Sequence, residues 1–80
     1  MMDHILVSVK IGNDDLDMEL PIKMKAHELV EQIVTNIKKN KADIIVEEGA
    51  NSIFCENKRI PDDKTLEECY ILDGEALEIR

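Results

Sequence analysis

The sequence predicts an α+β fold in which one mixed sheet has a single helix lying across one of its faces. Three observations lead to this prediction. Residues 4–20 hold two runs of alternating apolar and polar residues around a turn cluster, residues 26–40 carry a helical apolar stripe, and residues 75–80 alternate again. The last strand can pair in parallel beside the first, because the helix between them supplies the crossover that parallel pairing requires.

The first alternating run spans residues 4–11. A turn cluster follows at residues 12–15, and alternation then resumes until Pro21, which cannot donate a hydrogen bond to a sheet ladder. Two alternating runs joined by a short turn predict a hairpin with one apolar face. That face consists of Ile5, Val7, Val9, Ile11, Leu16, Met18 and Leu20, whereas Leu6, Ser8 and Lys10 point the other way.

Residues 26–40 predict a helix. Acidic residues occur early in this segment and lysines occur late, which suits the helix dipole. The expected N-cap position holds Met24 or Lys25, so no Ser, Thr, Asp or Asn side chain marks the helix start. The apolar stripe consists of Leu29, Val30, Ile33, Val34 and Ile37.

The sequence of residues 41–61 predicts short strands, loops and turns. The apolar residues 44–46 suit either a short strand or an apolar loop, and residues 47–51 suit a turn. We expect a strand at residues 52–56 and a turn at Asn57-Lys58. Arg59-Ile60 then continues the sheet briefly until Pro61.

The remaining residues predict a loop and the last strand. Residues 62–64 suit a loop, and residues 66–70 suit one turn of helix. Asp73-Gly74 predicts a tight turn. Residues 75–80 alternate as a strand, with Leu77 and Ile79 on one side.

The composition and the charge bound the class of protein. Eighty residues predict a single domain over residues 1–80. Eighteen acidic and ten basic residues give a net charge of −8, which disfavours binding to nucleic acid and to anionic membranes. No secretory signal pattern is visible, and every apolar run is far shorter than the roughly 20 residues that span a bilayer. We therefore expect a soluble, cytoplasmic protein whose partners carry basic patches.

Two cysteines, Cys55 and Cys69, have a spacing that matches no metal-binding or redox motif. They could form a redox pair or supply a thiol nucleophile. The sequence favours the simpler interpretation that both are small, buried apolar residues.

The sequence gives little support for a metal site or for acid–base catalysis. His27 and Glu31 lie one helical turn apart, and His4 has an acidic neighbour, but zinc requires three or four convergent ligands. Adjacent Asp62 and Asp63 have no predicted pocket around them. The acid-rich second half lacks a calcium-loop pattern and suits a solvated face; its acids are Asp62, Asp63, Glu67, Glu68, Asp73, Glu75 and Glu78. We expect no catalytic, cofactor-binding or metal-binding residues.

The last third of the chain resembles a known family. Ile53-Phe54 followed by Lys58, Thr65-Leu66 before Tyr70-Ile71, and the final Leu77-Glu78-Ile79 resemble the β-grasp, or ubiquitin-like, fold. The stretch 66–79 has a leucine, an acid–cysteine pair, an isoleucine, a glycine–acid turn and Leu-Glu-Ile. It resembles the C-terminal pattern of the YukD/EsaB family, small bacterial ubiquitin-like proteins of the type VII secretion system.

Ubiquitin-type modifiers and sulfur carriers of this fold need a flexible tail that ends in Gly-Gly, because its carboxylate must thread into an activating enzyme. The glycines of this chain, Gly12, Gly49 and Gly74, are internal. If Arg80 is the natural C-terminus, we expect neither conjugation nor sulfur transfer. That expectation agrees with the YukD/EsaB family, which lacks the tail.

In a β-grasp the helix covers one face of the sheet and leaves the other partly open. We expect partner binding on this outer face, where Leu6 and Ile53 would be apolar residues facing water. Scattered apolar residues are also normal on protein surfaces, so an ordinary surface remains an equal alternative. The predicted partner-binding residues are Leu6, Ser8, Lys10, Ile53, Glu78 and Arg80.

The resemblance implies a non-enzymatic cytoplasmic adaptor of a bacterial type VII secretion system. Such a protein would bind the motor ATPase or a membrane subunit without covalent conjugation or membrane insertion, as a monomer or weak homodimer, and with no cofactor. Two alternatives stay open. One is a modifier or sulfur carrier whose Gly-Gly tail lies beyond Arg80, and the other is a β-grasp interaction module of another complex.

Overall fold

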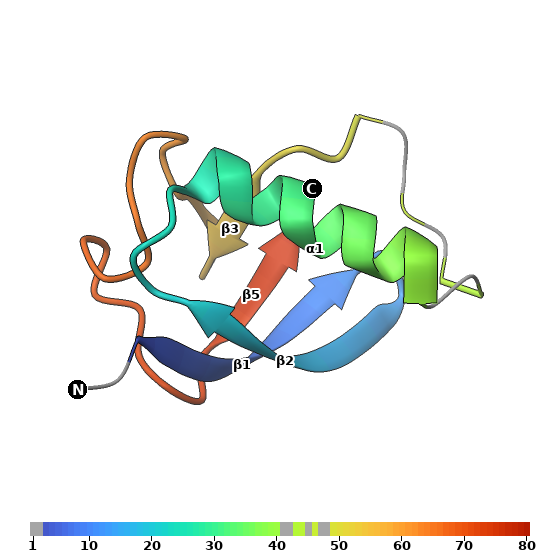
Figure 1. The fold of residues 1–80 in the computed structure, drawn as a ribbon, viewed down its shortest axis with the longest axis horizontal. Coiled ribbons are helices and arrows are strands. Elements are labelled where there is room, and N and C mark those ends of the chain that lie inside the picture. The colour runs from blue at the N-terminus through green and yellow to red at the C-terminus, as the bar shows by residue number, and fades with distance from the viewer. Residues whose placement is uncertain (1–2, 41–42, 45, 47–48) are drawn as a thin grey trace.

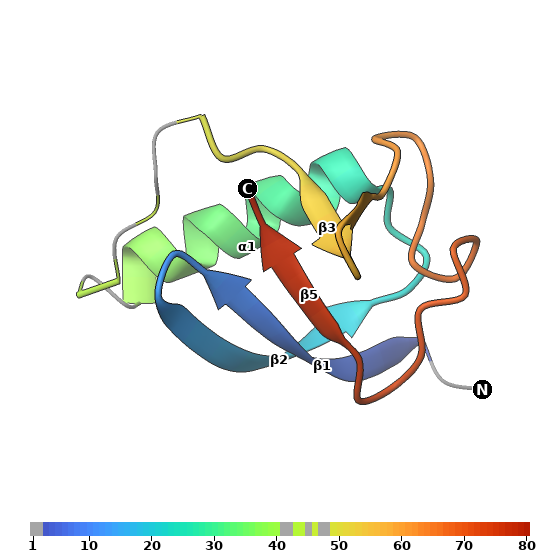
Figure 2. The same cartoon turned by 180° about the vertical axis from the view of Figure 1, so that it is seen from behind.

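The sheet has five strands in the order β2-β1-β5-β3-β4, with the helix across one face (Figure 1). We describe it from a computed structural model, which covers residues 3–40, 43–44, 46 and 49–80. Turned to its other side, the sheet shows the face that the helix leaves open (Figure 2). The elements are β1 (His4–Ile11), β2 (Asp14–Pro21), α1 (Ala26–Asn40), β3 (Ile53–Cys55), β4 (Lys58–Arg59) and β5 (Ala76–Ile79).

The hairpin of β1 and β2 has a shorter turn than the sequence predicted. Ile11 pairs with Asp14, so the loop is only Gly12-Asn13, and Asp14 and Asp15 already belong to β2. Gly12 has a φ of 60°, which glycine tolerates without strain. A glycine at the first position of a two-residue loop matches the strand twist of a hairpin, so the predicted four-residue turn was wrong at its second half.

The predicted apolar faces turn toward the core, although Leu16, Met18 and Val34 are only partly buried against it. Alternate residues of β1 are buried, and the helix has the predicted bounds of residues 26–40. The parallel pairing of β5 beside β1 is also confirmed, with Ser8 opposite Ala76 and Ile11 opposite Ile79. The core is aliphatic and includes Ile5, Val7, Val9, Ile11, Leu29, Val30, Ile33, Ile37, Ile53, Leu66, Leu77 and Ile79.

The start of α1 is capped by a distant loop instead of a local side chain. The Ala26 N–H donates to the Lys64 carbonyl at 2.8 Å, and the His27 N–H donates to the Asp62 carbonyl at 3.2 Å. Both views show the orange loop beside the beginning of the helix (Figures 1 and 2). The first N–H groups of a helix lack partners within it, so these carbonyls replace the missing N-cap residue.

The second half of the chain departs from the predicted boundaries. The turn between β3 and β4 is Glu56-Asn57, and both residues have positive φ, at 52° and 66°. Lys58, which the sequence placed in the turn, therefore belongs to β4. A two-residue loop with positive φ at both positions joins antiparallel strands without splaying them. The strands themselves are shorter than predicted: Ser52, Glu56, Ile60, Glu75 and Arg80 lie outside them.

Residues 66–70 form a series of turns and no helix. Tyr70 has a φ of 57°, which is outside the right-handed helical range, so a helix cannot continue through this residue. The Ile71 N–H donates to the Leu66 carbonyl at 3.0 Å, and both side chains are buried. Of the two alternatives for residues 44–46, the structure shows an apolar loop at Ile44 and Val46, which are partly buried against the core. Ile45 and residues 47–48 of the predicted turn lie outside the described residues.

Candidate functional site

The open face of the sheet carries a row of paired polar and aromatic residues. Because alternate side chains of β1 enter the core, Ser8 and Lys10 lie on the opposite face. The parallel register places Lys10 beside Glu78, and the antiparallel register of β3 places Glu78 beside Phe54. Residues paired in register share a face, so Lys10, Glu78 and Phe54 form one row across three strands. We call Ser8, Lys10, Phe54, Glu78 and Arg80 the outer face.

Arg80 holds this row together. Its guanidinium carbon lies 4.3 Å from the centroid of the Phe54 ring, within the range of a cation–π interaction. The same guanidinium donates to Glu78 Oε1 at 2.9 Å and to Asn57 Oδ1 at 2.8 Å. The hydrogen bond from Arg80 lowers the pKa of the Glu78 carboxyl, and the positive charges of Arg80 and Lys10 lower it further. The row is therefore charged with both signs.

A shallow cavity of about 230 Å³ lies over this row. Ser8, Lys10, Phe54 and Glu78 line it together with Asp15, from β2, and residues of the β3–β4 turn. The cavity offers a positive group, three carboxylates and one aromatic ring within a small area. Polar and aromatic side chains of a protein partner would therefore fit this surface better than aliphatic side chains would.

Ile53 does not belong to this face, and its predicted position was wrong. Its side chain is 0% exposed, and it pairs with Ile79 inside the core. Phe54 takes the outward position instead. The local sequence Ile-Phe-Cys is apolar on both faces, so it holds no polar residue that would mark the outward side. The register with β5 decides the direction of these side chains.

Leu6 lies on the same side of β1 as Ser8 but does not line the cavity around Phe54. It is 51% exposed and lines a separate cavity of about 330 Å³ with Asp3, Glu19 and Asp73, in addition to His4. Its backbone N–H donates to Asp73 Oδ1 at 2.7 Å. Of the six residues predicted from sequence, Ser8, Lys10, Glu78 and Arg80 lie together on the outer face. Leu6 lies on the same side of the sheet but lines a different cavity, and Ile53 is buried.

The two cysteines share one cavity of about 310 Å³ between β3 and the 61–75 loop. Both are free thiols and both are half-buried, so the prediction that they are buried holds only in part. Burial raises the pKa of the Cys55 thiol, and the negative charges of Glu75 and Glu56 raise it further. A thiol that resists ionisation is a weak nucleophile.

Several acids of the predicted solvated face bond to the protein itself. Glu68 accepts from the Thr65 N–H, Asp73 from the Leu6 N–H and Glu75 from the Leu72 N–H. These bonds shape the 61–75 loop. Within the described residues, no group of three or more His, Cys, Asp or Glu residues gathers as metal ligands do.

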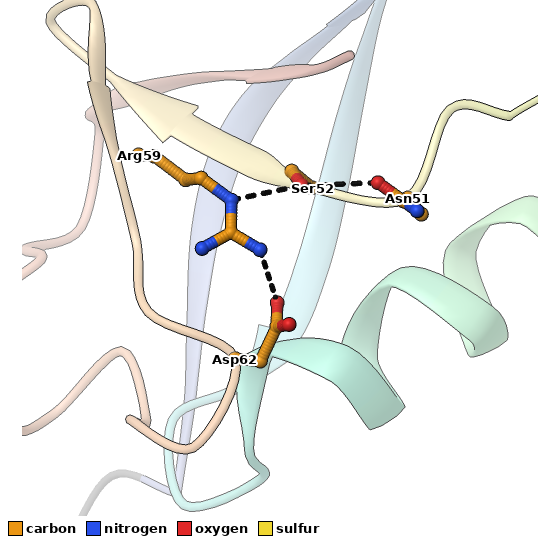
Figure 3. A network of polar contacts seen from close by, with 4 residues as sticks. All are labelled: Asn51, Ser52, Arg59 and Asp62. Carbon is orange, nitrogen blue, oxygen red and sulfur yellow. Dashed lines mark hydrogen bonds and ion pairs between the residues drawn. The ribbon is translucent and has the colours of Figure 1, made fainter.

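Asp62 belongs to a further polar network, which Figure 3 shows. Arg59 donates to Asp62 Oδ1 at 2.9 Å and to Ser52 Oγ at 3.1 Å, and Ser52 Oγ donates to Asn51 Oδ1 at 3.1 Å. Because the Asp62 carbonyl also caps α1, this network ties the β3–β4 hairpin to the helix start. No helix in the described ranges has the length and apolar character needed to cross a bilayer.

Comparison with known proteins gives one family and several solved folds. The family model described as "WXG100 protein secretion system (Wss), protein YukD" matches residues 4–79. No curated protein matches the sequence significantly.

Two solved ubiquitin-like domains resemble the whole chain in structure. The EccD5 ubiquitin-like domain from Mycobacterium xenopi has a TM-score of 0.77 at 13% identity, over 96% of this chain and 92% of its own. The ubiquitin-like domain of the Mycobacterium tuberculosis type VII secretion system protein ECCD1 has a TM-score of 0.71 at 17% identity, over 98% of both chains. At these identities the likeness concerns the fold, and it confirms the ubiquitin-like β-grasp.

A chain of the MycP5-free ESX-5 inner membrane complex is similar as well. Its TM-score is 0.79 at 16% identity, over 99% of this chain but only 21% of that larger one. In that complex, the matching fold makes up about a fifth of the chain.

Proposed function

The chain belongs to the YukD family of the WXG100 protein secretion system, and from this premise we propose that it is a non-enzymatic adaptor of that system. It is a ubiquitin-like module associated with type VII secretion. In the proposed role it works in the bacterial cytoplasm, as a single domain and without covalent conjugation. It binds a subunit of the secretion machine through its outer face.

The observation that carries the proposal is the preorganised cluster of Phe54, Glu78 and Arg80. The guanidinium of Arg80 is held by three contacts, so its side chain is ordered before a partner arrives. Aromatic and arginine side chains dominate binding energy at protein interfaces, and prior ordering reduces the entropy lost on association. Lys10 and Glu78 add charges of opposite sign that would set the orientation of a partner.

The proposed partner is the motor ATPase or a membrane subunit of the secretion system. A similar fold within the ESX-5 inner membrane complex supports a place beside membrane-bound subunits. The net charge of −8 supports a partner with a basic surface.

Native co-purification tests the proposal. Tagged wild-type protein is expected to recover subunits of the secretion machine, whereas Phe54→Ala and Lys10→Glu are expected to recover about tenfold less, because each removes an anchor of the outer face. Gln32→Ala, on the exposed side of α1, serves as the control and is expected to behave as wild type. Circular dichroism checks that each variant is folded.

Two outcomes count against the proposal in different ways. If wild-type protein recovers no secretion subunit, the adaptor role is wrong. If the wild type recovers subunits and the folded Phe54→Ala and Lys10→Glu variants recover them equally well, the adaptor role stands and the outer face is not the docking site.

A further inference from the structure

Strand β2 is an open edge of the sheet over eight residues. The strand order places β2 at one end and the two-residue β4 at the other. The other hydrogen-bonding edge of β1 is already occupied, since the Ser8 N–H donates to the Glu75 carbonyl and the Gly74 N–H donates to the Leu6 carbonyl. An edge of this length can accept an additional strand from another protein.

The pairing register of β2 with β1 determines which β2 residues point their backbone N–H and C=O groups outward at this edge. Ile11 and Asp14 flank a two-residue loop, so they form a hydrogen-bonded pair, and such pairs recur at every second position. The intervening residues of β2 therefore direct their N–H and C=O groups away from β1. These are Asp15, Asp17 and Glu19, which we call the β2 edge. Among the described residues, no backbone partner is present for their N–H groups.

The side chains of the β2 edge are all acidic and exposed. Asp15 is paired in register with Lys10, whereas Asp17 faces Ser8 and Glu19 faces Leu6. None of the three forms an ion pair within 4.0 Å with any described residue. The edge thus carries a row of negative charge on the open face of the sheet.

The other face of β2 offers aliphatic surface. Leu16 and Met18 alternate with the acidic residues along β2, so they lie on the face of the sheet that the helix covers. They are nevertheless only partly buried against the core. A strand added beside β2 would place alternate side chains next to the acids and the remaining ones next to Leu16 and Met18. The best complement is an extended segment in which basic and aliphatic residues alternate.

We propose that the β2 edge binds such a basic, alternating segment of a partner protein by strand addition. This surface goes beyond the proposed adaptor role, because it specifies the chemistry of a second contact and shares only Asp15 with the cavity over the outer face. A second copy of the chain is a poor occupant, since pairing β2 with β2 would set acids opposite acids. Pro21 limits the added strand at one end, because it offers no N–H to the ladder.

A synthetic peptide of alternating Lys and Val, titrated into the full chain, tests this surface. Amide NMR shifts are expected at Asp15, Asp17 and Glu19, and exchange of these amide protons with solvent is expected to slow when the peptide pairs with them. Asp17→Lys/Glu19→Lys is expected to weaken binding at least about tenfold and to bind a Glu–Val peptide instead, because opposite charges across strands attract and like charges repel.

Further variants separate the backbone from the charge and the edge from the rest of the surface. Asp17→Asn removes one charge, and Asp17→Pro also removes an outward N–H that the native sheet does not use, so Asp17→Pro is expected to bind more weakly than Asp17→Asn. Glu31→Lys/Glu28→Lys makes the same charge change as the double variant on the exposed side of α1 and is expected to leave binding unchanged. Phe54→Ala is also expected to leave it unchanged.

Three results would overturn the proposal. In one, the helix variant weakens binding as much as the edge variant, which means unspecific charge attraction. In another, sedimentation shows that the free chain dimerises and that Asp17→Pro makes it monomeric, which means that β2 pairs with a second copy. In the third, the peptide causes no amide shifts at the edge of the wild-type chain.

Discussion

At the scale of the residue, the Glu78 carboxylate shows how one neighbour sets a site's charge. Arg80 donates to it at 2.9 Å, and this bond lowers the pKa of Glu78 and raises that of Arg80. A carboxyl with a lowered folded-state pKa adds stability above its unfolded pKa, and that contribution is lost as the pH falls through the folded value. The charge pair of the outer face is therefore present at neutral pH and disappears in acid.

The titration of Glu78 by NMR checks this pair. The side-chain carbon shift of Glu78 is expected to titrate below the usual glutamate range in the wild type. In Arg80→Ala it is expected to titrate at a higher pH, because the hydrogen bond and the positive charge are both removed. Equal titration curves in the two proteins would show that Arg80 does not hold the carboxylate in solution.

Cys55 gives a second prediction at this scale. Burial and nearby carboxylates raise its pKa, so little thiolate is present at mildly alkaline pH. In a Cys69→Ser variant, alkylation of Cys55 by iodoacetamide is expected to be slower than alkylation of an unfolded control peptide with the same local sequence. Mass spectrometry over time measures both rates, and faster reaction in the folded protein would contradict the assigned environment.

At the scale of the element, the 61–75 loop organises the end of the sheet opposite the hairpin turn. The Thr65 N–H donates to Glu68 Oε1 at 3.0 Å, and the Glu68 N–H donates to Thr65 Oγ1 at 3.1 Å. This is the reciprocal pattern of a capping box. It anchors the loop that places the Lys64 and Asp62 carbonyls on the first N–H groups of α1.

Thr65→Ala is expected to lower the free energy of unfolding by about 1 kcal/mol, because one side-chain acceptor is lost. Urea denaturation measures the change, and Thr65→Ser, which keeps the hydroxyl, is the matched control. Hydrogen exchange at the Ala26 and His27 amides is expected to quicken in Thr65→Ala alone. Unchanged exchange at these amides would mean that the loop holds its place without the capping box.

At the scale of the whole molecule, one aliphatic layer is built from residues of the helix and of strands β1, β2, β3 and β5. Ile53 lies in that layer at 0% exposure, and its neighbour Phe54 lies on the outer face. Two adjacent apolar residues therefore serve different purposes. Ile53 contributes to folding, and Phe54 is available for a partner.

Ile53→Ala is expected to destabilise the protein by about 2–5 kcal/mol, since a buried isoleucine leaves a cavity that the core cannot fill completely. Phe54→Ala is expected to cost much less, because the ring is only partly buried. Urea denaturation compares the two free energies of unfolding. Equal losses would mean that the ring of Phe54 packs into the core more deeply than its position on the outer face implies.

The outer face was predictable from the sequence only on the strands with clear alternation. Ser8 and Lys10 follow directly from the buried positions around them, and Glu78 follows from Leu77 and Ile79. Phe54 was missed because its strand is three residues long and apolar on both sides. The exposure of the backbone at the β2 edge could not be predicted from the sequence either, because it depends on the order of the strands in the sheet.

Local periodicity in the sequence determined the hairpin, the bounds of α1 and the aliphatic core, because the burial of one face by each element requires a repeating pattern. The ubiquitin-like fold was recognised through a family resemblance of particular residues in the last third of the chain, such as Leu77-Glu78-Ile79. Only the tertiary structure decided the cap of the helix start, the direction of Ile53 and Phe54, and the edge position of β2. Each of these depends on contacts between residues that are far apart in the chain, such as Ala26 with Lys64 and Ile53 with Ile79, and no local pattern records such contacts.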